Sequence, residues 1–279
     1  MKYSLWDRSK GIEANYRSVL FKFVKSLVRL AKKSNGDIDK FNQYISDYSA
    51  TQSFRRYCRL AAKRMVTPVA NINAQTWRKA ARRSTKSRMI YKALMQNINS
   101  GLDQSIYEQI ERNATIISTL PLDVSQKVTR KIYEGTMSGK RAKTLSKEII
   151  QFTNGYSRAS AKLIARTEVS KTQTALTRAR SANLKIDWYV WRTEEDQRVR
   201  ESHRTMDGVI VPWGSPPSPE MLTGLPSAKG NAHYHAGEIY NCRCYPEPLL
   251  EVEDVRWPHK VYYLGKIQMM TRQQFEKIY

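Results

Sequence analysis

The sequence predicts an α+β fold: a mostly helical, basic N-terminal half, then a small mixed α/β domain with a long helix, short strands and an irregular Pro-rich loop. Apolar residues recur at helical spacing through the first half of the 279 residues. Aromatic and β-branched residues typical of a strand first gather at 186–193, and a Pro/Gly/Ser-rich stretch fills 212–241. We therefore divide the chain into a basic helical region (1–125), an α+β domain (126–250) and a C-terminal tail (251–279).

Helices are predicted from apolar stripes and from the residues that begin and end them. Asp37 caps one helix in this way. Pro68 and Pro121 mark expected stops, because the residue before a proline avoids helical backbone angles. The predicted helices cover 16–34, 37–49, 52–66, 73–98, shorter segments within 102–155, and a long helix over 157–183.

Strands are predicted where β-branched and aromatic residues gather, at 186–193, 209–211 and 242–253. Pro246 and Pro248 confine the last of these to a sheet edge, because proline cannot donate a ladder hydrogen bond. The stretch 212–241 is too long for an ordinary connection, so we expect it to be functional or irregularly packed. The tail is predicted to end in a short helix over 271–279.

The chain carries a formal charge of +23, which points to a polyanionic partner. Residues 1–100 hold 22 Lys and Arg against 5 Asp and Glu, while the other 179 hold 26 against 20. Double-stranded DNA, contacted without sequence specificity, is the first candidate, ahead of an anionic membrane surface or an acidic protein. These basic residues form either a phosphate-contacting surface or a solvated helix face: Arg55, Arg59, Lys63, Arg78, Lys79, Arg82, Arg83, Lys86 and Arg88.

Composition argues against several protein classes. Three cysteines are too few for a disulfide scaffold. The N-terminus lacks the apolar core of a signal peptide, and no window reaches 18 consecutive apolar residues. We therefore expect a soluble protein of a reducing cytoplasm, with no membrane partner.

The segment 193–208 concentrates acids, arginines and a histidine. Thr193 and Asp196 fit the capping pattern of a helix over 194–204. On that helix Asp196 and Arg200 lie four residues apart and can form an ion pair. His203 is either a general base oriented by a neighbouring carboxylate or a structural hydrogen-bond hub. No nucleophile or oxyanion donor stands at a recognisable spacing, which favours the structural interpretation.

Four soft or borderline metal ligands lie within twelve residues: His233, His235, Cys242 and Cys244. Zinc accepts two imidazoles and two thiolates in a tetrahedral set, and such an ion can stabilise an irregular loop. The His-x-His and Cys-x-Cys spacings are not those of common zinc fingers. A buried thiol pair or a disulfide between the two cysteines is the competing interpretation. No other cofactor is expected.

An ordered series of short motifs resembles the phage Mu F-like minor head protein family, also called the phage head morphogenesis domain. The series runs over roughly 130–250 and contains Arg166-Thr167-Glu168, Trp191-x-Thr193, Asp196-x-Arg198-Val199-Arg200, His203, Asp207-Gly208 and Asn241-Cys242-Arg243-Cys244. The His233-Tyr234-His235 stretch is not part of this resemblance. The N-terminal half carries no such motif.

The resemblance implies a component of the virion, assembled in the host cytoplasm and located in the head of a tailed phage. Its implied partners are portal protein, major capsid or scaffolding protein, and packaged DNA. We expect a fully hydrogen-bonded polar network to fix its fold. The residues of that network are Arg166, Glu168, Asp196, Arg200, His203 and Asp207.

Three functions are consistent with the sequence. The first is a structural, non-enzymatic head morphogenesis protein that acts at the portal vertex or in the head interior. The second is a metal-assisted hydrolase or nuclease that uses His203 with a metal at Cys242 and Cys244. The third is a DNA-binding accessory protein that leaves the head with the genome.

Overall fold

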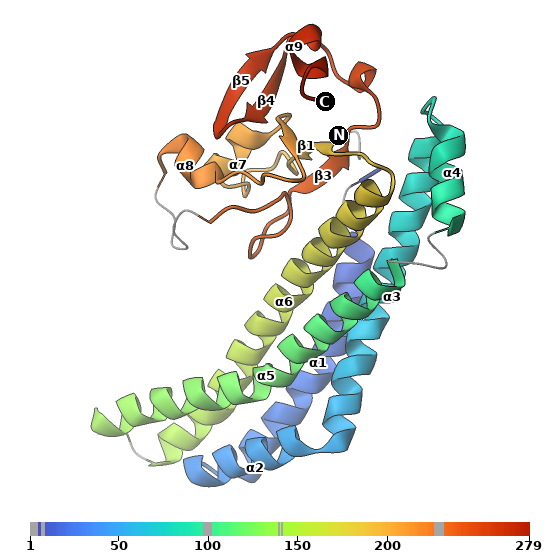
Figure 1. Cartoon of the computed structure of the whole chain (residues 1–279). Coiled ribbons are helices and arrows are strands. Elements are labelled where there is room, and N and C mark those ends of the chain that lie inside the picture. Colours follow the sequence, from blue (N-terminus) through green and yellow to red (C-terminus); the bar gives the residue numbers. More distant parts are fainter. Residues whose placement is uncertain (1–4, 7–8, 97–101, 139, 141, 226–231) are drawn as a thin grey trace. The chain divides into compact units, whose positions relative to one another are not determined.

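The computed structural model describes residues 5–6, 9–96, 102–138, 140, 142–225 and 232–279. It confirms the α+β class, with long helices and one five-stranded sheet (Figure 1). The chain forms two compact units, each assembled from segments distant in sequence. The helical unit comprises Lys10–Thr67 and Tyr107–Arg166, and the sheet unit comprises Met1–Ser9, Pro68–Ile106 and Thr167–Tyr279. The division at 125/126 that the sequence suggested stays a prediction, and that position lies inside a helix.

The helical unit is built from the predicted apolar stripes. It contains α1 (Lys10–Lys33), α2 (Ile38–Ala50) and parts of α3 (Gln52–Ala81), α5 (Leu102–Met137) and α6 (Ala142–Asn183). The stripe of α1 is buried as expected, and its Phe23 ring stacks on Phe54 of α3 with centroids 5.4 Å apart. Asp37 caps α2, because its side chain accepts a hydrogen bond from the backbone N–H of Lys40 at 3.0 Å. That predicted cap is confirmed.

Both predicted proline stops are wrong. Pro68 lies inside α3 and Pro121 lies inside α5. A proline in a helix removes one backbone hydrogen bond and costs about 3 kcal/mol. Neighbours on each helix are buried: Met65, Val66 and Val69 around Pro68, and Leu120 and Val124 around Pro121. Burial of such side chains returns about 1.5–3 kcal/mol each, so packing outweighs the proline penalty.

Two further helix boundaries differ from the prediction. The helix expected over 73–98 is the end of α3 and the separate α4 (Ser87–Gln96). The long helix expected from residue 157 is α6, which begins fifteen residues earlier, at Ala142. Among the described helices, none is apolar over a length that would cross a lipid bilayer.

The sheet has the strand order β3-β1-β2-β4-β5 and is antiparallel except where β2 pairs with β4. Its strands are β1 (Trp188–Arg192), β2 (Ile210–Pro212), β3 (Tyr245–Pro248), β4 (His259–Tyr263) and β5 (Lys266–Met270). The three predicted strands are thus confirmed, and β3 with its two prolines is an edge strand as expected. Trp191 of β1 faces Pro246 of β3 in the register.

The β4–β5 hairpin was not predicted. Leu264 and Gly265 join its strands with φ of 50° and 78°, the left-handed pair that a two-residue hairpin turn requires. The sequence signal was present, since a Gly-containing dipeptide is flanked there by aromatic and β-branched residues. The short C-terminal helix is confirmed as α9 (Arg272–Glu276), and Thr271 caps it.

The segment between β1 and β2 is mostly irregular. The helix predicted over 194–204 is wrong: only the short α7 (Glu201–Met206) forms, and Glu195 has a left-handed φ of 52°. The predicted irregular character of 212–241 is confirmed where it is described, with one short helix, α8 (Pro219–Thr223). Residues 226–231 of that stretch lie outside the described part of the chain.

Candidate functional site

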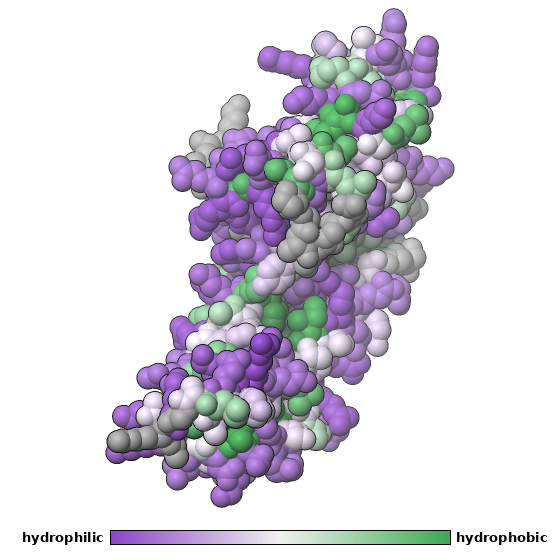
Figure 2. Space-filling model, turned by 90° about the vertical axis from the view of Figure 1, so that its left-hand side faces the viewer, coloured by the Kyte–Doolittle hydropathy of each residue, from purple (hydrophilic) through white to green (hydrophobic). Residues whose placement is uncertain are grey.

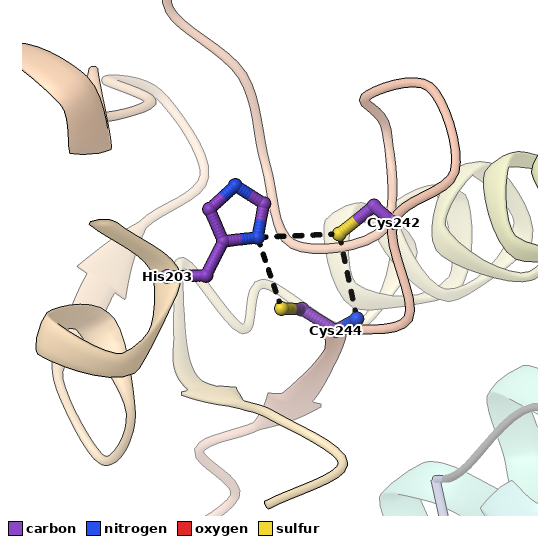
Figure 3. A group of neighbouring side chains, drawn as sticks. All are labelled: His203, Cys242 and Cys244. Carbon is purple, nitrogen blue, oxygen red and sulfur yellow. Dashed lines mark hydrogen bonds between the residues drawn. The ribbon is translucent and has the colours of Figure 1, made fainter. Parts of the chain in front are cut away.

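One histidine and two cysteines meet inside the sheet unit. His203 lies on α7, and Cys242 and Cys244 lie just before β3 (Figure 3). The three residues are 2%, 2% and 3% exposed. The His203 Nδ1 atom is 3.3 Å from Cys244 Sγ and 3.6 Å from Cys242 Sγ. This is the only group of three or more potential metal ligands found among the described residues.

The far side of the imidazole is held by a buried relay. Tyr234 places its hydroxyl 2.9 Å from His203 Nε2 and 2.8 Å from each carboxylate oxygen of Glu220. The single hydroxyl proton goes to Glu220, because a carboxylate accepts hydrogen bonds and does not donate them. The oxygen of Tyr234 therefore accepts a hydrogen bond from Nε2–H of His203. In the neutral ring this leaves Nδ1 as a bare lone pair, and that atom faces the two sulfurs.

Helix α6 holds the loop that carries the cysteines. Thr174 donates from its hydroxyl to the Ala236 carbonyl at 2.7 Å, and the Asn241 backbone N–H donates to the Thr167 hydroxyl at 3.0 Å. Gly237 lies between them with φ +87°, and a Cβ there would lie 2.5 Å from Thr174 Oγ1. Only glycine fits this combination of a left-handed backbone and close approach. Thr167 belongs to the Arg-Thr-Glu motif, so the structure gives that motif a positioning role.

An ion pair closes the loop on its outer side. Both terminal nitrogens of the Arg243 guanidinium, Nη1 and Nη2, donate to the carboxylate of Asp196. The same carboxylate accepts from the Arg198 backbone N–H at 2.9 Å. The hydrogen bond from Arg243 is the main reason that the pKa of Asp196 falls to about 2. The predicted capping role of Asp196 is therefore wrong, since its carboxylate binds a side chain 47 residues away and a turn N–H.

Several residues of the predicted polar network have partners outside it. Arg200 donates to the Tyr240 carbonyl at 2.8 Å. Asp207 accepts from the Thr193 backbone N–H at 2.7 Å. Thr193 does not cap a helix as expected, because the next helix, α7, begins only at Glu201. Glu168 is buried on α6 in the sheet unit. Arg166 belongs to the helical unit and lies 3.5 Å from Glu13.

The predicted ligand set is only partly brought together. His233 is exposed, and its Nδ1 lies 2.9 Å from the Pro216 carbonyl. His235 is buried with its Nδ1 3.2 Å from the Tyr189 hydroxyl, and burial lowers its pKa to about 4. Neither belongs to the cluster with the cysteines. The third member is His203, which the sequence had placed with the cysteines only in the hydrolase alternative.

Sequence reasoning assigned no role to the residues that support the cluster, Tyr234, Glu220 and Arg243. Glu220 is 7% exposed and also accepts a hydrogen bond from the Ser202 hydroxyl at 3.3 Å. Its burial at the start of the short helix α8 gave no local signal. A glutamate in a Pro-rich stretch is expected at the surface, because carboxylates are rarely buried without a partner, and the sequence does not reveal that Tyr234 is its partner.

The two thiols of the cluster differ in acidity. Burial raises the pKa of Cys242, but its hydrogen bond with the Cys244 thiol and its position beside His203 outweigh burial and bring that pKa well below the usual cysteine range. The hydrogen bond to Cys242 and burial together raise the pKa of Cys244. Cysteine binds a metal ion through its thiolate form, and here two thiols lie beside a bare imidazole nitrogen.

The nine basic residues predicted to contact DNA fall in both units. Arg55, Arg59 and Lys63 are exposed on α3 in the helical unit, beside a groove shared with α5. Arg59 lies 2.8 Å from Glu111 across that groove. The other six lie in the sheet unit, on α3, on α4 and on the turn between them: Arg78, Lys79, Arg82, Arg83, Lys86 and Arg88. Of these six side chains, five are exposed and Lys86 is partly buried. Figure 2 shows one side of the molecule, and hydrophilic residues cover much of it.

Comparison with known proteins identifies the region that holds the cluster. Residues 126–246 match the family described as Phage Mu protein F like protein. This part of the chain is Mu F-like. The resemblance inferred from the motifs is confirmed. The Mu F-like segment includes His203, Cys242 and Cys244, and it ends within β3, before the β4–β5 hairpin.

A Haemophilus influenzae protein, described as an uncharacterized protein, is similar to half of the chain. It is 30% identical over 139 residues, which are 50% of this chain and 28% of that protein. The chain thus covers little more than a quarter of the length of this relative. No solved structure matches the chain.

Proposed function

We propose that this protein is a structural minor head protein of a tailed phage, which acts in head morphogenesis at the portal vertex or in the head interior. The observation that carries the proposal is the Mu F-like match over 126–246. The structure adds support, because the motif residues of that segment are used to hold a loop in place. Thr167, Asp196, Asn241 and Arg243 each bind across the segment.

The geometry of the cysteine cluster supports a structural role over metal-assisted hydrolysis. His203, Cys242 and Cys244 are each at most 3% exposed, and the cavity beside them measures about 50 Å³. Pockets that take small organic ligands are typically about 300–1,000 Å³. The small volume beside the cluster therefore supports an ion over a nucleotide or a peptide as its occupant.

The proposed role includes contact with packaged DNA. The exposed arginines and lysines of α3 and α4 supply charge without any base-reading motif, which suits binding to phosphates of any sequence. The net charge of +23 favours such contact, and phosphate neutralisation by these side chains releases condensed counterions. Portal protein and major capsid or scaffolding protein are the proposed protein partners.

The proposal can be tested in the phage that encodes the chain, by placing a stop codon early in the reading frame of this protein. We expect purified wild-type heads to contain the protein, with cross-links to portal protein, and the mutant to yield fewer DNA-filled heads. Normal yields of filled heads, together with absence of the protein from wild-type particles, would contradict a role in the virion. Complementation with the wild-type chain controls for effects on downstream genes.

The accessory-protein alternative differs in where the chain goes at infection. A structural head protein stays in the emptied particle after DNA release is triggered, whereas an accessory protein leaves with the DNA. Mass spectrometry of emptied particles, with portal protein as the internal standard, separates the two. A full-length chain that retains its ratio to portal protein supports the structural role.

A further inference from the structure

We propose that His203, Cys242 and Cys244 bind a single zinc ion, which is a structural element of the Mu F-like segment. The ligands are Nδ1 of the histidine and the two Sγ atoms, and a water molecule fills the fourth position. The set differs from the one expected from sequence spacing, because His233 and His235 are replaced by a single histidine of α7. The zinc site does not depend on the proposed role in the phage head.

The nitrogen-to-sulfur distances of the cluster are those of a tetrahedral zinc site. Zinc bonds of about 2.3 Å to sulfur and 2.0 Å to nitrogen place neighbouring N and S ligands about 3.5 Å apart, and two sulfurs about 3.8 Å apart. The Nδ1 atom of His203 is 3.3 Å and 3.6 Å from the two sulfurs. All three donor atoms lie within 4.8 Å of one another. A small closing movement of the sulfurs completes the site.

A hydrogen-bonded thiol pair accounts less well for this arrangement. The Tyr234–Glu220 relay fixes the proton of His203 on Nε2, so Nδ1 offers one lone pair. One lone pair accepts one S–H proton, although the sulfurs of both Cys242 and Cys244 lie beside it (Figure 3). The second thiol is then left with the other sulfur as its acceptor, and sulfur is a weak acceptor. A metal ion satisfies both sulfurs and the nitrogen together.

The charges of the site also favour a divalent ion. Binding releases the two thiol protons to solvent, and two thiolates with Zn²⁺ and a neutral imidazole sum to zero. Such a centre can be buried without a compensating charge, whereas an isolated thiolate cannot. Arg243, the basic side chain nearest in sequence, is already paired with Asp196. Mixed sulfur and imidazole ligands select zinc over the oxygen-preferring Mg²⁺ and Ca²⁺.

The surroundings have the features of an outer ligand shell. Metal-binding histidines commonly donate their second ring N–H to a fixed acceptor, which orients the ring and raises its basicity. His203 does so to Tyr234, which in turn donates to Glu220. The cavity of about 50 Å³ beside Cys242 and Cys244 is large enough to hold a water molecule as the fourth ligand.

The ion would join parts of the chain that no strand pairing connects directly. His203 lies on α7, between β1 and β2, and the cysteines follow the long irregular stretch that starts at β2. A bond between these parts stabilises the irregular loop in the folded state, since the ligands are far apart in the unfolded chain. The role of the ion is therefore architectural.

The first test is the metal content of the full chain, purified without chelator and measured by elemental analysis. We expect about one zinc per chain. The zinc should be lost in Cys242→Ser and in Cys244→Ser. It should be retained in two control variants: Cys58→Ala, which changes a buried cysteine outside the cluster, and His233→Ala. Retention of zinc by both serine variants, or its loss in His233→Ala, would overturn the proposed ligand set.

The second test uses the unmodified chain and so does not depend on folding of the variants. After dialysis against chelator, Co²⁺ is added as the probe, and absorption spectra are recorded. We expect thiolate-to-cobalt charge-transfer bands and tetrahedral d–d bands that saturate at one Co²⁺ per chain and that added Zn²⁺ displaces. Absence of these bands would overturn the proposal. So would a Cys242–Cys244 disulfide, which would make the mass of the chain two hydrogens lower than that of the reduced form.

The third test addresses the relay. Tyr234→Phe keeps the three ligands and removes the acceptor of the His203 Nε2–H group. Loss of an outer-shell partner lowers metal affinity by about 10- to 100-fold. We expect a shift of this size in Zn²⁺ affinity by competition with a chromophoric chelator, and no shift in Tyr133→Phe, whose tyrosine is 66% exposed. An unchanged affinity in Tyr234→Phe would contradict the assignment of Nδ1 as the metal ligand.

Discussion

Asp196 and Arg243, 47 residues apart in sequence, form a two-bond ion pair that fastens the cysteine loop to the segment after β1. The geometry is the parallel fork that guanidinium and carboxylate groups favour. The Arg243 side chain is 9% exposed and that of Asp196 is 30% exposed, so the pair lies at the edge of the core. It fixes the residue between the two cysteines.

The ion pair makes stability depend on pH in the acid range. The pKa of Asp196 is lowered to about 2 by Arg243, against a usual value of 3.8. Because the folded-state pKa is depressed, its contribution is present above about pH 4 and is lost as the pH falls toward 2. We expect Asp196→Asn to lower the free energy of unfolding by about 1–2 kcal/mol at pH 7, a moderate figure because the carboxylate is partly exposed.

Urea unfolding of the wild type and of Asp196→Asn at several pH values measures this effect. The difference between the two should shrink as the pH drops from 5 toward 2. A difference that stays constant over that range would mean that the carboxylate charge of Asp196 does not stabilise the fold.

Gly237→Ala should be strongly destabilising. Its φ of +87° costs a non-glycine residue about 1–2 kcal/mol. The added Cβ would also lie 2.5 Å from Thr174 Oγ1 and 3.0 Å from the Cys244 carbonyl oxygen. The loop that carries the cysteines would therefore have to move away from α6. Gly208→Ala is the matched control, since its φ is +77° and its Cβ would have open space. Thermal unfolding of both should show the larger loss in Gly237→Ala, and equal losses would contradict the close approach.

Tyr234→Phe should destabilise the fold even without metal. The hydroxyl of Tyr234 satisfies both the His203 Nε2–H group and the Glu220 carboxylate in the core. Leaving buried polar groups without partners costs about 1–3 kcal/mol each. Urea unfolding in the presence of chelator measures the effect on the apo chain. A change below about 0.5 kcal/mol, the size of an ordinary surface substitution, would show that water replaces the hydroxyl.

Glu111→Gln should strengthen binding to random-sequence duplex DNA if the α3 face contacts phosphates. Glu111 lies 2.8 Å from Arg59 and competes with phosphate for this arginine. One more phosphate contact steepens the dependence of log affinity on log salt by about 0.9. Fluorescence anisotropy over a series of salt concentrations measures the slope. Glu276→Gln, which removes one of the two carboxylates paired with Arg272 on α9, is the control of equal charge. A matching change there would indicate a general charge effect.

Features that depend on a few neighbouring residues were predictable. The apolar stripe of α1 and the Asp37 cap of α2 depend on spacing within one or two helical turns. Pro246 and Pro248 placed β3 at an edge, because a missing N–H is a local property. The hairpin turn at Leu264 carried a readable local signal as well.

Features that depend on distant partners were not predictable. Asp196 had a plausible partner four residues away, yet its carboxylate binds Arg243, because the fold brings a better-matched guanidinium to it. Pro68 was expected to end a helix, yet burial of its neighbours outweighs the lost hydrogen bond.

The sequence by itself determined the α+β class, the basic character of the first half and the Mu F-like resemblance, because periodicity, charge and motif order are properties of the linear chain. Only the tertiary structure decided which histidine meets Cys242 and Cys244. Spacing favoured His233 and His235, which are near in sequence, while His203 is 39 residues from the nearer cysteine. The physical reason is that three donor atoms must converge within a few ångströms, and that convergence is set by the packing of α7 and the cysteine loop around the Tyr234–Glu220 relay.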